Sequence, residues 1–153
     1  MRDKKWVLEH RGGSLKIEQQ KQLMKWAIDC ISHLLPLLHN NINEKIVNAL
    51  NTGNSWIIGK AKTGDAINVS REIVKYVNTL DDELEIAITR AAGHAVATAH
   101  MADHSMGAVY YGLMAIKITG GSMDSELNWQ IEQIPDEIKE LVIDGLKNKG
   151  IIK

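Results

Sequence analysis

The segment AAGHAVATAHMADHSMGA, residues 91–108, places three histidines and an aspartate among small and apolar residues. Eleven of its eighteen residues are Ala, Gly, Ser or Thr. Small side chains let neighbouring backbones approach closely. Histidine in such surroundings is either a buried hydrogen-bonding group or part of a site. We therefore expect this segment to lie at the centre of the fold, and its polar residues are the first candidates for a site.

Apolar residues recur at spacings of three and four along the chain, which predicts an all-α fold. The pattern and its flanking Asn, Asp, Ser, Pro and Gly residues predict helices over 16–36, 43–59, 65–77, 82–119, 122–134 and 135–149. The stretch 82–119 is too long for one ordinary helix, so we predict a break at 101–103, with Asp103 capping the helix that follows. Pro135 is expected at the first position of the last helix. The result is one domain over residues 1–153, a bundle of six or seven helices at 15–149 behind an N-terminal arm at 1–14.

The charge and cysteine content narrow the classes of function. Eighteen Lys and Arg against nineteen Asp and Glu give a formal net charge of −1, which argues against electrostatic attraction to nucleic acid or anionic lipid. Cys30 is the single cysteine, so no intramolecular disulfide can form, as is typical of a reducing compartment. Neither a signal peptide nor a membrane-spanning run is apparent. We expect a cytoplasmic protein.

Two interpretations of the histidines stay open. On an unbroken helix His100 and His104 would share one face, and Asp103 could join them as metal ligands. Cys30 and His33, three residues apart on another helix, could add further ligands to zinc or another divalent transition metal, with hydrolysis as the activity of such a site. The alternative is structural, because buried histidines commonly bond a carbonyl or a carboxylate, and the glutamate of H-E-x-x-H is missing. We therefore expect no cofactor and no catalytic residues, and keep the metal-binding bundle as the second hypothesis.

Several motifs together resemble a known family. These are HRGG at 10–13, KWAIDCISHLLPL at 25–37, RAAGHAVATAHMADHSMGA at 90–108, and Trp129 followed by IPDE at 134–137. In combination they resemble the all-helical "five-like" immunity proteins of bacterial polymorphic toxin systems. The resemblance implies a small cytoplasmic α-helical protein that neutralises a cognate protein toxin by binding it, without catalysis.

Four residues are candidates for contact with such a toxin. They are His10 and Arg11 on the glycine-rich turn of the arm, and Asp103 and His104 at the predicted helix break. Arginine is favoured at the energetic centres of interfaces, and helix ends offer unpaired backbone groups. A homodimer is the remaining possibility for the partner, with the small residues of 91–108 packed across a subunit interface.

Overall fold

Short polar side chains set the start of several helices. A computed structural model describes residues 2–153, and in it the side chains of Asn43, Asp82 and Ser122 each accept a hydrogen bond from a backbone N–H three residues later. The α-helices are α1 (Ile17–Leu34), α2 (Glu44–Ile57), α3 (Thr63–Val77), α4 (Glu83–Ala97), α5 (His104–Ile118), α6 (Met123–Glu132) and α7 (Asp136–Asn148). Three short 3₁₀ helices add η1 (Lys4–Trp6), η2 (Glu9–Arg11) and η3 (Leu35–Leu38). Residues 2–153 contain no β-strand, so the predicted all-α bundle is confirmed.

Two predicted helix starts were wrong by one or two residues. α3 begins at Thr63 instead of Asp65, because the carboxylate of Asp65 accepts a hydrogen bond from the Lys62 backbone N–H at 2.9 Å and so belongs inside the first turn. Pro135 precedes α7 as its N-cap, with an extended ψ of 143°, and Asp136 is the first helical residue. The first helix, predicted over 16–36, ends at Leu34. Pro36, which has no backbone N–H to donate, lies in η3 just beyond it.

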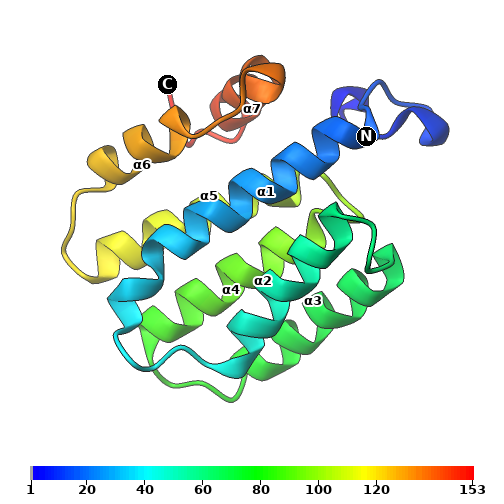
Figure 1. Cartoon of the computed structure of the whole chain (residues 1–153). Helices are drawn as coiled ribbons and strands as arrows, with labels where there is room; N and C mark the ends of the chain where they lie inside the picture. Colours follow the sequence, from blue (N-terminus) through cyan, green and yellow to red (C-terminus); the bar gives the residue numbers. More distant parts are fainter. Residues whose placement is uncertain (1) are drawn as a thin grey trace.

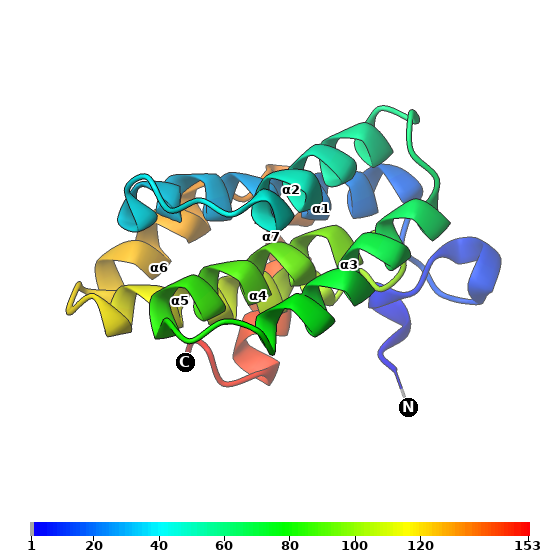
Figure 2. The same ribbon diagram turned by 90° about the horizontal axis from the view of Figure 1, so that it is seen from below.

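The helices form two layers with a flanking pair. Figure 2 shows α3, α4 and α5 side by side beneath α1 and α2. In Figure 1, α6 and α7 lie beyond α1, on the side away from α2 and α3. The most extensive helix–helix contact joins α4 to α5, the two helices that the segment 91–108 connects. None of the described helices combines the length and hydropathy needed to span a bilayer.

The small residues of 91–108 allow this close packing. Ala91, Ala92 and Ala95 are fully buried. A Cβ added at Gly93 would lie 2.8 Å from Cγ2 of Ile73 on α3, and a Cβ at Gly107 on α5 would overlap the ring of His94 on α4. The expectation that this segment lies at the centre of the fold is therefore confirmed.

The N-terminal arm folds back on itself and packs onto the bundle. Its backbone pairs Ser14 N with Lys4 O at 3.0 Å and Leu15 N with Val7 O at 3.0 Å. Trp6 and Leu15 are both buried in one apolar cluster with residues of α1, α5 and α7. The arm is thereby placed against the end of the bundle where α4 passes into α5.

Candidate functional site

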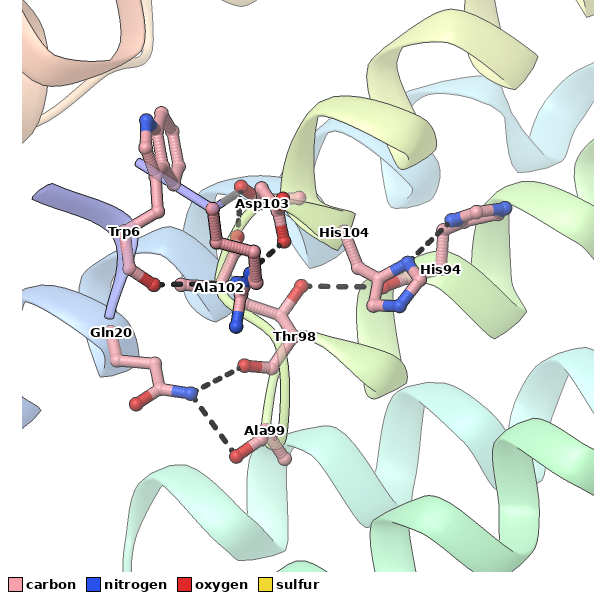
Figure 3. A network of polar contacts seen from close by, with 10 residues as sticks. Trp6, Gln20, His94, Thr98, Ala99, Ala102, Asp103 and His104 are labelled. Atoms are coloured by element: carbon pink, nitrogen blue, oxygen red, sulfur yellow. Dashed lines mark hydrogen bonds and ion pairs between the residues drawn. The ribbon is translucent and has the colours of Figure 1, made fainter. Parts of the chain in front are cut away.

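α4 and α5 are joined by a connector, residues 98–103, which is held from a distant part of the chain. The buried side chain of Gln20, on α1, donates from Nε2 to the carbonyl oxygens of Thr98 at 2.8 Å and Ala99 at 3.1 Å (Figure 3). These bonds satisfy two carbonyls that no helix would otherwise pair. The predicted break between the two helices is thus confirmed, and its backbone is fixed.

The arm secures the other end of the connector. Nη2 of Arg2 donates to Oδ1 of Asp103 at 3.0 Å and to the Trp6 carbonyl oxygen at 3.5 Å. Asp103 occupies the N-cap position of α5, as predicted, but its side chain does not cap the helix. It makes no capping hydrogen bond, and its φ and ψ, −71° and −9°, are helical. The carboxylate is used for the ion pair with Arg2, a residue too distant in sequence to be anticipated.

Three histidines meet beside the connector, and we call them the histidine cluster: His94 on α4, His100 in the connector and His104 at the start of α5. The Nδ1 atoms of His94 and His104 are 3.1 Å apart (Figure 3). The ring centroids of His100 and His104 are 5.5 Å apart. The premise that His100 and His104 share one continuous helix was wrong, yet the break brings their rings together and adds His94, which was not among the proposed metal ligands or partner contacts.

The surroundings favour the neutral form of all three rings. Burial, reinforced by His104 and Arg90, lowers the pKa of His94 from 6.5 to about 4. Burial also lowers the pKa of His100, helped by His104 and Arg71. For His104, burial lowers the pKa and nearby Asp103 partly opposes it. In the hydrogen bond between His94 and His104, one neutral ring therefore donates and the other accepts.

A hollow of about 330 Å³ opens beside the cluster. It is lined by residues of α3, α4, the connector and α5. Its polar lining consists of the histidine cluster with Ser70, Arg71, Asn78, Arg90 and Tyr111. The guanidinium of Arg90 lies 5.8 Å from the ring centroid of Tyr111, within cation–π range. No Asp or Glu of the described chain lines this hollow, so its walls present hydrogen-bond donors and positive charge.

The family model described as "Imm-5 like putative immunity protein" matches residues 13–137. The chain belongs to this immunity-protein family. None of the curated proteins and none of the solved structures compared with it matches the chain.

The immunity-family match covers the connector, the histidine cluster and the hollow, whereas His10 and Arg11 precede it. Both of these residues are exposed on η2 and line a second hollow, of about 180 Å³, together with Arg2 and His100. The four residues predicted to contact a partner are thus arranged around one end of the bundle. Arg71, Arg90 and Tyr111 were not predicted from the sequence, because only the packing of α3, α4 and α5 brings them to the histidine cluster.

Cys30 and His33, the other proposed metal ligands of this immunity-family member, lie outside the histidine cluster. His33 stacks on Trp129 with ring centroids 3.6 Å apart, and its Nδ1 is 3.2 Å from Oε2 of Glu126. Cys30 is buried nearby, and burial, with Glu126 and Asp29, raises the pKa of its thiol. Within residues 2–153, no three or more His, Cys, Asp or Glu side chains are arranged to hold a metal ion. The zinc hypothesis stays a prediction without an assembled ligand set.

Proposed function

We propose that this protein binds a cognate bacterial toxin in the cytoplasm and blocks it sterically, without catalysis. Its membership of the immunity-protein family carries this proposal. The binding surface that we propose is the connector face, defined as His10, Arg11, Asp103 and His104 together with Arg2 and His100. It combines the predicted contact residues with two neighbours that the fold supplies.

The construction of the connector face suits a rigid binding surface. Its backbone is held by Gln20 from α1 and its Asp103 side chain by Arg2 from the arm. A surface that is ordered before binding loses less conformational entropy when the complex forms. The face can therefore bind with little rearrangement.

The charge of this region indicates the kind of toxin surface it fits. Several cations are close enough to lower the pKa values of the histidine cluster. Arg2 and Arg11 belong to the connector face, and Arg71, Arg90 and Lys149 lie beside it. The single carboxylate with the opposite effect is that of Asp103. The chain as a whole has a formal net charge of −1, so positive charge is concentrated here. An acidic patch around the toxin's active site would complement it and accelerate association.

The decisive experiment joins partner capture to a growth assay. The tagged protein is recovered from its native lysate, and the gene of a stoichiometric partner is expressed alone and together with this protein. We expect the partner to arrest growth and co-expression to restore it. The Arg11→Glu variant should lose protection, whereas Lys139→Glu, the same charge reversal at an exposed position of α7, should retain it. A partner that does not arrest growth would contradict the toxin hypothesis. Full protection by Arg11→Glu would contradict the proposed binding face.

The homodimer hypothesis is tested by light scattering. The small residues that were expected to form its interface, among them Ala91, Ala92 and Ala95, are fully buried within one chain. They are therefore unavailable to a second copy, and we expect the mass of a monomer.

A further inference from the structure

The geometry points to a binding site for a small organic anion in the hollow between α3, α4 and α5, with a carboxylate or phosphate group attached to a compact apolar body. This inference goes beyond toxin binding and does not depend on it. The hollow, of about 330 Å³, falls at the lower end of the roughly 300–1,000 Å³ typical of small-molecule sites. The occupant is thus a small metabolite-sized molecule.

The polar side of the hollow is suited to an oxyanion. Arg71 on α3 and Arg90 on α4 both line it, and neither forms a salt bridge with any residue of 2–153. Guanidinium groups match the geometry of carboxylate and phosphate oxygens and bind them in charge-assisted pairs. Because no carboxylate of the described chain lines the hollow, the two arginines attract an anion and no negative side chain repels it. The same two positive charges would repel a divalent cation.

The histidine cluster supplies neutral donors beside these charges. Nδ1 of His100 is buried and has no hydrogen-bond partner within residues 2–153. Buried polar atoms are rarely left unpaired. His100 itself lines the hollow, so its ring lies beside the position proposed for the anion. The mutual hydrogen bond of His94 and His104 leaves one nitrogen on each ring free to donate or accept.

The remaining side chains of the lining are apolar. They are Ile73, Val74 and Val77 on α3 and Ala97 on α4. Apolar walls with a few convergent polar groups are the usual composition of ligand sites. The arrangement therefore favours an anion that carries an apolar group over inorganic phosphate or sulfate.

Benzoate is a suitable probe, since it joins a carboxylate to a compact ring, and benzamide is its neutral counterpart. Isotope-labelled protein is titrated with each compound while the imidazole resonances are recorded by NMR. We expect saturable benzoate-dependent shifts of His94, His100 and His104, and none with benzamide. Arg71→Gln and Arg90→Gln should each weaken benzoate binding at least about tenfold, because each removes a charge-assisted pair.

Lys75→Gln is the matched control, because Lys75 is exposed on the same helix as Arg71 but does not line the hollow. It should leave benzoate affinity unchanged. Equal shifts with benzoate and benzamide, no shifts at all, or an equal loss of affinity in Lys75→Gln would overturn the proposal. So would near-stoichiometric zinc in untagged protein, lost on mutation of His100 or His104 to Ala. These outcomes are independent of the growth assay, so either proposal can fail alone.

Discussion

Nδ1 of His94 and Nδ1 of His104 lie 3.1 Å apart, joining the last turn of α4 to the first residue of α5. A hydrogen bond between two imidazoles needs one nitrogen with a proton and one without. The contact is therefore compatible with two neutral rings and is opposed by a second positive charge. It makes the junction of the two most closely packed helices sensitive to protons.

The unfolding free energy should consequently fall in mild acid. The pKa of His94 is about 4 in the folded chain, against 6.5 as its ordinary value, so the unfolded chain takes up the proton first. The contribution of His94 to the unfolding free energy is therefore complete above about pH 6.5. It is lost as the pH falls toward about 4, which lowers the unfolding free energy by about 1–3 kcal/mol. Tyr111 on α5 packs beside this ring, with ring centroids 5.2 Å apart, and the positive charge of Arg90 on α4 opposes its protonation.

Urea unfolding at a series of pH values measures this effect. His94→Asn retains a polar amide near the Nδ1 position but cannot titrate. Its stability should vary less between pH 6.5 and 4 than that of the wild-type chain. Parallel curves for the two proteins would refute the assignment to His94.

Gly107→Ala should destabilise the protein and displace the ring of His94. A Cβ at this position would overlap that ring, and overpacking of this kind costs about 1–3 kcal/mol. Gly64→Ala is the control, since it lies within α3 with nothing within 4 Å of its added Cβ and should be neutral or stabilising. Thermal unfolding of both variants tests the prediction, which fails if Gly107→Ala is as stable as Gly64→Ala.

Gln20→Met should loosen the connector. It keeps the length of the side chain and removes the donor to the Thr98 and Ala99 carbonyls, at a cost of about 2–4 kcal/mol for two buried acceptors left unpaired. Gln22→Met, which removes an exposed hydrogen bond to Glu137, should cost less than about 0.5 kcal/mol. Hydrogen exchange should accelerate at residues 98–103 in the first variant. Unchanged protection there would show that the connector does not depend on Gln20.

Cys30 should be unreactive in the native protein. The residue is 1% exposed, so a reagent cannot reach its sulfur. Burial also raises the pKa of the thiol, so little of the reactive thiolate forms. Ellman's reagent should label about one thiol per chain in guanidinium chloride and almost none without it. Rapid labelling of the folded chain would contradict this burial.

Local signals in the sequence predicted the helices well and the site poorly, for one physical reason. Caps such as Asn43 and Asp82 act within three residues of themselves, so the sequence reveals them. Asp103 carries the same local signal, but Arg2 competes for its carboxylate from 101 positions away. The pairing of His94 with His104 depends on how sharply the chain turns between α4 and α5. Residue types indicate that such a turn exists and leave its geometry undetermined.

The connector's contacts also bear on the order in which the molecule assembles. Gln20 reaches it across 78 and 79 positions of the chain, and Arg2 reaches Asp103 across 101. Closing loops of this length costs entropy that adjacent helices such as α4 and α5 do not lose when they pair. We therefore expect the helical hairpin to form early and residues 98–103 to reach their final shape late, after α1 and the arm have docked. A folding intermediate would then have its helices in place and the proposed binding face still unformed.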